Sequence, residues 1–161
     1  MKNIIVLLLA LNSGLSQGAE NIYRLIEPQS SAAIGCWIND YQHYEKIVGY
    51  SNLGHIFLFN PSNNDYAVFY PFRGAAKSYG AFSSIKEFEE SVLLDPGFLE
   101  YVLKPEQVQN IRNQLGALEG DDIYIPQPYP FLGGDQSVNS FTKGELWIML
   151  DIVSQLREDC V

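Results

Sequence analysis

Alternating apolar segments in the first half of the chain predict an antiparallel sheet. Two segments rich in β-forming residues, His55–Asn60 and Asp65–Phe72, flank a turn-forming sequence of proline, serine and asparagine. This arrangement predicts a β-hairpin over about residues 55–72. Lys46–Ser51 is a candidate third strand, and Ile34–Ile38 is predicted to form a further short strand.

The second strand of this hairpin is apolar on both faces. Because side chains alternate along a strand, Tyr66, Val68 and Tyr70 share one face. Ala67 and Phe69 share the other face. An apolar run of this length is typical of a fully buried strand. We therefore expect the strand to be central in its sheet and covered on both sides.

Three helix starts follow one another between residues 84 and 116. Ser84-Ile85-Lys86-Glu87 is a capping box, in which the serine hydroxyl accepts from the first turn and the glutamate reaches back. Asp95-Pro96 and Lys104-Pro105 each place proline at a first helical position. Apolar residues recur at helical spacing after these starts. The segment therefore predicts three short helices, at about residues 84–116, packed on the sheet.

The last third of the chain combines a short strand, a loop and a long apolar segment. Ile123–Ile125 is a predicted strand, and the prolines that follow it interrupt regular structure. Leu146–Leu156 is so densely apolar that both a strand and a helix remain open. Strands, then helices, then a strand predict an α+β domain: a small antiparallel sheet with helices on one face.

Charge and length narrow the classes of partner. The 161 residues fit one domain, and 19 acidic against 10 basic residues give a net charge of −9. A negative surface repels phosphate backbones, so we expect no nucleic-acid partner. It attracts a basic protein and accelerates the association with it.

The N-terminus follows the pattern of a secretory signal peptide. One lysine precedes the apolar segment Ile4–Leu11, and small residues follow up to Ala19. We predict a signal peptide over 1–18 and a single domain over 20–161, with a periplasmic or secreted location. The apolar segment is too short to span a bilayer, so no membrane association is expected after its removal. The alternative is an N-terminal helix of a cytoplasmic protein.

The two cysteines are Cys36 and Cys160, near the two ends of the predicted domain. Export to an oxidising compartment would allow a disulfide between them. Their spacing excludes CxxC redox and zinc patterns, and we expect neither a metal nor a cofactor. In a cytosolic protein they would be ordinary buried thiols.

No set of catalytic residues stands out, and a binding protein is predicted rather than an enzyme. Gly49–Gly54 is one residue too long for a G-x-S-x-G elbow. His43 and His55 stand in no metal-binding motif. Two alternatives remain open: a secreted hydrolase that uses Cys36 and His43, and a periplasmic module that binds cell wall or carbohydrate through its tyrosines.

Two short segments repeat one motif, Tyr70-Pro71-Phe72 and Tyr129-Pro130-Phe131. Aromatic residues beside proline form rigid apolar surface of the kind that recognition sites use. Buried aromatic residues of the core would give the same pattern. The Tyr129–Pro130 bond is also a candidate cis peptide bond.

Several segments together carry a resemblance to a known family. They are Gly49–Leu58, Tyr70–Phe72, Ala75–Gly80, Phe88–Glu90, Asp95–Phe98, Tyr124–Gly134 and Lys143–Trp147. Over roughly residues 34–157 the chain resembles the C-terminal domain of type VI secretion system DNase immunity proteins. Such proteins often carry an N-terminal glutamate-tRNA-amidotransferase-related domain, whereas this chain begins with a signal-like segment.

The resemblance implies a protein that binds and neutralises a cognate antibacterial toxin by occluding its active site. An adjacent gene is expected to encode that toxin. No catalytic residues carry over, because the family acts by binding. We expect the partner-binding surface to combine an acidic turn with the loop after it: Glu119, Asp121, Asp122, Tyr129, Phe131 and Asp135.

Overall fold

A computed structural model describes residues 22–157. The predicted signal peptide, residues 1–18, and Cys160 lie outside the described residues.

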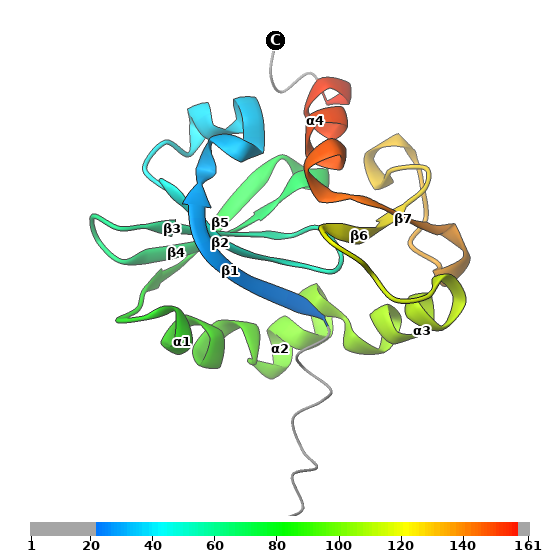
Figure 1. Ribbon diagram of the computed structural model, residues 1–161, viewed down its shortest axis with the longest axis horizontal. Coiled ribbons are helices and arrows are strands. Elements are labelled where there is room, and N and C mark those ends of the chain that lie inside the picture. Colours follow the sequence, from blue (N-terminus) through cyan, green and yellow to red (C-terminus); the bar gives the residue numbers. More distant parts are fainter. Residues whose placement is uncertain (1–21, 158–161) are drawn as a thin grey trace, which may run out of the picture.

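Five antiparallel strands form the main sheet and follow one another in sequence order (Figure 1). They are β1 (Tyr23–Ser30), β2 (Lys46–Ser51), β3 (Ile56–Asn60), β4 (Asp65–Tyr70) and β5 (Ala75–Ala81). The predicted hairpin is confirmed as β3–β4, and the candidate third strand is β2. The strands β1 and β5, at the two edges of the sheet, were not expected from the sequence.

The segment Ile34–Ile38 is not a strand, and the prediction made for it is wrong. It lies within η1 (Ser31–Asp40), a 3₁₀ segment between β1 and β2. Buried side chains recur there at every third residue, at Ser31, Ile34 and Trp37. That spacing matches the three residues per turn of a 3₁₀ helix rather than the alternation of a strand.

The three predicted helices are confirmed and form one layer. They are α1 (Ile85–Phe88) continued by η3 (Glu89–Leu93), α2 (Pro96–Phe98) continued by η4 (Leu99–Leu103), and α3 (Pro105–Leu115). The capping box forms in part, since the Ser84 hydroxyl accepts from the Glu87 amide at 3.2 Å. The Glu87 carboxylate accepts from the Ser83 amide at 2.7 Å. The Asp95 carboxylate caps α2 as expected.

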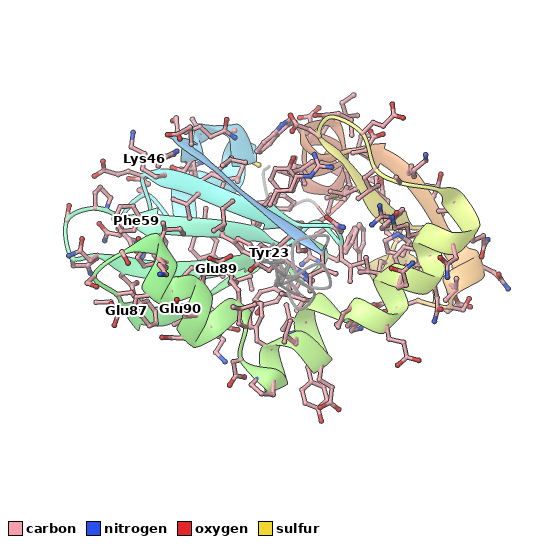
Figure 2. The ribbon with its side chains drawn as sticks, turned by 60° about the horizontal axis from the view of Figure 1, so that its bottom comes forward. Tyr23, Lys46, Phe59, Glu87, Glu89 and Glu90 are labelled. Atoms are coloured by element: carbon pink, nitrogen blue, oxygen red, sulfur yellow. The ribbon has the colours of Figure 1, made fainter. Side chains whose placement is uncertain are left out.

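This helical layer covers one face of the sheet. The Tyr23 hydroxyl of β1 donates a hydrogen bond to the Glu89 carboxylate of η3 at 2.6 Å, and Figure 2 shows the two side chains facing each other. Glu87 and Glu90 are exposed to solvent. The layer thus presents carboxylates outward while its apolar side chains pack against the sheet.

Strand β4 is buried on both faces, as its sequence predicts. Tyr66 and Val68 pack in the core beneath the helical layer. Ala67 and Phe69 pack in a second core on the opposite face. All four side chains are buried because β4 is an interior strand with a layer on either side.

The second layer contains α4 (Leu146–Leu156), so Leu146–Leu156 is a helix and not a strand. Figure 1 shows α4 on the opposite side of the sheet from α1, α2 and α3. Its residues Leu146, Met149, Leu150 and Val153 are buried in the core that contains Phe69. The expectation of helices on one face only is therefore wrong. Within residues 22–157, no helix is long and apolar enough to cross a membrane.

A separate two-stranded hairpin joins the helical layer to α4. It consists of β6 (Asp122–Pro126), the predicted strand, and β7 (Phe141–Glu145). Asp122 pairs with Glu145 at one end of the hairpin, and Pro126 pairs with Phe141 at the other. The Asp122–Glu145 end lies at the start of α4, and the Pro126–Phe141 end lines a cleft beside the main sheet.

Candidate functional site

Asp121 of the predicted acidic turn is held in a network of internal hydrogen bonds. Its Oδ1 accepts from the Tyr50 hydroxyl at 2.8 Å, and its Oδ2 accepts from the indole Nε1 of Trp147 at 3.0 Å. The hydrogen bond from Tyr50 contributes most to lowering the pKa of Asp121, followed by that from Trp147 and the charge of Arg24. Asp121 thereby connects β2, the start of β6 and α4.

Arg24 of β1 completes this network. Its Nη1 donates to the carbonyl oxygen of Gly120, and the same nitrogen lies 3.4 Å from the Tyr50 hydroxyl oxygen. The guanidinium also lies over the Tyr50 ring, 5.9 Å from its centroid. The acidic turn is thus held against the first two strands of the sheet.

The other acidic residues of this turn, Glu119 and Asp122, differ in exposure, and Asp122 is half-buried. Glu119 is exposed, and Asp122 pairs across the hairpin with Glu145. Like charges on directly paired residues repel each other. A cation placed beside Asp122 and Glu145 would therefore reduce this repulsion. We call Glu119, Asp121, Asp122 and Glu145 the acidic corner. Glu145 was not among the predicted site residues.

An apolar stripe on α4 continues from the acidic corner. Ile148, Ile152 and Leu156 are 61%, 41% and 50% exposed and follow one another at a spacing of four residues, along one helix face. The Glu145 carboxylate accepts from the Ile148 amide at 2.7 Å, which places the end of the stripe directly beside the corner. We call these three residues the α4 stripe.

The loop with Tyr129, Phe131 and Asp135 lies at the other end of β6. The strand between the two parts is about 13 Å long, at about 3.3 Å per residue. Tyr129 is buried, Phe131 is half-buried, and the Asp135 carboxylate accepts from Ser137 and Ser140. The structure therefore does not bring the acidic turn and this loop into one patch.

The two Tyr-Pro-Phe segments meet in space. Each forms a 3₁₀ turn, η2 (Pro71–Arg73) and η5 (Pro130–Leu132). The Phe72 ring centroid lies 5.6 Å from that of Tyr129, so these aromatics form an internal contact between the two turns. The cis peptide bond of this region is Gln127–Pro128, so the expectation for Tyr129–Pro130 is wrong.

Gly133 and Gly134 allow the second turn to fold back on itself. Gly133 has a φ of 84°, a left-handed conformation that favours glycine. A side chain at Gly134 would collide with the carbonyl group of Pro128. The two glycines therefore serve the tight turn after Phe131.

A cleft of about 480 Å³ opens between the main sheet and the β6–β7 hairpin. Arg73, Lys77 and Lys104 line it, and no aspartate or glutamate does so among the described residues. Its tyrosines are Tyr70, Tyr79 and Tyr101. We call it the basic cleft. The sequence does not predict this cleft, because its cations are single residues on different elements of an acidic chain.

His55 also lines the basic cleft. Its Nδ1 lies 2.9 Å from the Ser51 hydroxyl, which accepts from the amides of Leu53 and His55. Burial, together with the smaller effect of the charges of Lys104 and Arg73, lowers the pKa of His55 to about 4. Ser51 has no exposed surface, so this pair cannot present a serine nucleophile to a substrate.

The residues of the alternative thiol hydrolase are Cys36 and His43. Cys36 lies in η1 and is bonded in a disulfide, which leaves no thiolate there. His43 is exposed, and its ring lies tilted against that of Tyr44 with a centroid distance of 4.2 Å. Cys160 lies outside the described residues, so its pairing with Cys36 stays a prediction.

Comparison with solved structures shows a related fold. The crystal structure of Atu4351 from Agrobacterium tumefaciens matches with a TM-score of 0.57 at 16% sequence identity. The match covers 84% of this chain and 67% of that chain. At this identity the likeness concerns the fold alone. No curated protein matches the sequence.

A family model matches the part of the chain that contains the helical layer, the β6–β7 hairpin and α4. The acidic corner, the α4 stripe and Lys104 all lie in this part. The resemblance noted in the sequence is thereby confirmed for the second half of the chain. Over residues 83–157, the chain matches the family described as T6SS immunity protein Tdi1, C-terminal.

Proposed function

We propose that this protein binds a cognate type VI secretion toxin and neutralises it by covering its active site. The observation that carries the proposal is the family match over residues 83–157. We further propose that the acidic corner and the α4 stripe form the toxin-binding surface, and that a gene adjacent to this one encodes the toxin.

The chemistry of this surface supports that choice. Protein interfaces combine an apolar centre with a polar rim, and the α4 stripe beside the acidic corner has both parts. Three exposed aliphatic side chains on one helix face are costly to hydrate, so covering them favours association. The like-charged pair Asp122 and Glu145 would be relieved by a lysine or arginine of the partner.

The charge of the chain adds a kinetic argument. A net charge of −9 attracts a basic partner from a distance and raises the association rate. Toxins that act on nucleic acids need a basic surface to bind phosphate groups. An acidic protein that docks on this surface would block the substrate directly.

The experiment uses the full chain and the product of the adjacent gene. We expect co-expression to protect cells from that toxin, and the two purified proteins to form a complex by size-exclusion chromatography and calorimetry. Ile148→Asp and the double change Asp122→Asn/Glu145→Gln should each weaken binding by at least about ten-fold. Glu145→Gln keeps a side-chain oxygen that can cap α4.

Matched controls separate a specific surface from a general effect of charge. Glu90→Gln/Glu100→Gln removes the same charge from exposed residues of the helical layer. Leu94→Ser changes an exposed apolar residue, 37% accessible, on that layer. Both controls should leave toxin affinity unchanged. Equal losses in controls and test variants would refute the surface, and absence of any complex would refute the function.

We also propose that residues 1–18 direct export and are then removed. An exported immunity protein would neutralise a toxin in the periplasm. The readout is the N-terminal residue of the protein recovered from the periplasmic fraction. Recovery from the cytoplasm with Met1 intact would contradict this location, and would leave the proposed binding surface unaffected.

A further inference from the structure

The basic cleft concentrates positive charge in an acidic protein. Three of the 10 basic residues of the chain line it, while none of the 19 acidic residues does so among the described part of the chain. Like charges gathered in a concave, partly desolvated site repel one another. A site of this kind is favourable when an anion occupies it.

Among the described residues, none of the three cations has an acidic partner. Within residues 22–157, no carboxylate lies within 4.0 Å of the charged group of Arg73, Lys77 or Lys104. Arg73 lies over the Tyr70 ring and Lys77 over the Tyr79 ring, at 5.4 Å and 4.8 Å from the centroids. Lys104 makes a long hydrogen bond of 3.5 Å to the Gln136 side chain. The three charges are therefore available to a ligand.

His55 adds a neutral hydrogen-bond donor to this site. The Ser51 hydroxyl oxygen accepts two amide hydrogens, so its own proton is directed to Nδ1 of His55. The ring proton then resides on Nε2, on the other side of the ring. Because burial keeps the ring uncharged, His55 can donate to an anion without adding a fourth positive charge.

The size and aromatic lining of the cleft indicate the class of anion. Its volume of about 480 Å³ falls within the range of small-molecule sites, about 300–1,000 Å³. Tyr101 lines the cleft and is 72% exposed, so its aromatic ring is accessible to a flat ring that could stack on it. A long nucleic acid would be repelled by the net charge of the protein, whereas a small phosphate compound would meet mainly the cations of the cleft.

Lys104 supplies a second indication that this place is functional. Its φ of 50° puts a non-glycine residue in the left-handed region, directly before Pro105. Such strain is costly and is concentrated at ligand-binding sites and switches. The conformation begins α3 and places the Lys104 side chain in the cleft lining.

We propose that the basic cleft binds a nucleotide, with its phosphate held by Arg73, Lys77 and Lys104 and its base stacked on Tyr101. This proposal goes beyond toxin neutralisation and does not depend on it. The cleft and the acidic corner adjoin opposite ends of the β6–β7 hairpin, so the two sites can be tested separately.

The test is calorimetric titration of the full chain in a phosphate-free buffer. The probes are the four common ribonucleoside 5′-monophosphates, with adenosine, ribose 5-phosphate, inorganic phosphate and a glutamate hexapeptide as comparisons. We expect at least one nucleotide to bind with a Kd of about 10–100 µM, a value reasonable for a ligand of its size. Adenosine and ribose 5-phosphate should bind at least about ten-fold more weakly, since each lacks one half of the contacts.

Variants assign the two halves of the site. Arg73→Gln and Lys104→Gln should each lower nucleotide affinity about ten-fold, because each removes a charge-assisted contact. Tyr101→Ala should reduce the affinity of the nucleotide to that of ribose 5-phosphate. Lys86→Gln, which removes an exposed charge from α1, is the matched control and should leave the Kd unchanged.

Several results would overturn the proposal. The first is that no nucleotide binds at millimolar concentration. The second is that ribose 5-phosphate or inorganic phosphate binds as tightly as the nucleotide, and the third is that the acidic peptide binds more tightly than the nucleotide. An equal loss in Lys86→Gln would also do so, since it would indicate a general effect of charge.

Discussion

The indole Nε1 of Trp147 donates a hydrogen bond to Oδ2 of Asp121 at 3.0 Å. The Tyr50 hydroxyl donates a hydrogen bond to the other carboxylate oxygen, Oδ1. One aspartate thus links strand β2 of the sheet to the first turn of α4. Asp121 was expected to serve partner binding. Its two internal hydrogen bonds give it a structural role, which can be measured apart from toxin binding.

Replacing Asp121 should destabilise the fold. Asp121→Ala leaves the buried Tyr50 hydroxyl and the Trp147 indole without their acceptor, and we expect a loss of about 2 kcal/mol in the free energy of unfolding. Urea denaturation measures it. Asp122→Asn is the control and should be neutral or slightly stabilising, because it removes a like-charge pair with Glu145. Equal effects of the two changes would contradict the network.

The stability of the fold should depend on pH through His55. Burial lowers its folded pKa to about 4, whereas an unfolded histidine titrates near 6.5. The unfolded state therefore binds more protons between these values, and stability falls as the pH falls through this window. Between about pH 7.5 and pH 5 we expect a loss of about 2 kcal/mol in the free energy of unfolding.

Denaturant titrations at several pH values, with two histidine variants, provide the check. His55→Gln should remove most of the slope between about pH 5 and pH 7. His43→Gln is the matched control, since the His43 side chain lies on the surface, and should retain the slope. A slope that survives His55→Gln would show that other groups cause it.

The backbone strain at Lys104 should be removable. Glycine adopts the left-handed conformation without a side-chain clash, so Lys104→Gly should raise stability by about 1 kcal/mol and the Tm by roughly 2–5 °C. Lys86→Gly, inside α1, should instead lower stability by about 1 kcal/mol. Thermal unfolding followed by circular dichroism distinguishes them. A lower Tm for Lys104→Gly would mean that the Lys104 side chain stabilises the fold more than its backbone strains it.

Replacing Arg157 by lysine should destabilise the fold. Its guanidinium donates to the carbonyl oxygens of Phe72 at 2.9 Å and Arg73 at 3.1 Å, and lies over the Phe131 ring. A lysine ammonium cannot reproduce this planar geometry, so Arg157→Lys should cost about 1–2 kcal/mol in the free energy of unfolding. Arg112→Lys is the control, because no hydrogen bond of the Arg112 side chain to another described residue is present. A neutral Arg157→Lys would contradict the bridging role.

Local chemistry made much of the fold predictable. The β3–β4 hairpin, the two-faced burial of β4 and the cap residues Ser84 and Asp95 each depend on residues close in sequence. A capping side chain needs only an amide two or three residues away, and alternation needs only one strand. The likeness to an immunity-protein domain was also visible from the order of short motifs.

The elements that the sequence does not predict depend on partners distant in the chain. The edge strands β1 and β5 are partly exposed and carry mixed side chains, so their periodicity is weak. Strand β7 has β6 as its pairing partner, which lies more than a dozen residues earlier in the chain. The apolar segment that became α4 could not be assigned, because dense apolar residues suit either a helix or a buried strand.

The sequence by itself identified acidic and aromatic residues as candidates for binding. The tertiary structure decided which of these side chains lie together on one surface. Glu119, Asp121 and Asp122 are close in sequence, yet packing of α4 beside them bound the exposed Asp121 carboxylate to Trp147 and added Glu145. The cations of the basic cleft converge only because sheet, helical layer and hairpin enclose one space. Convergence of distant residues follows from packing of complete layers, which no local pattern specifies.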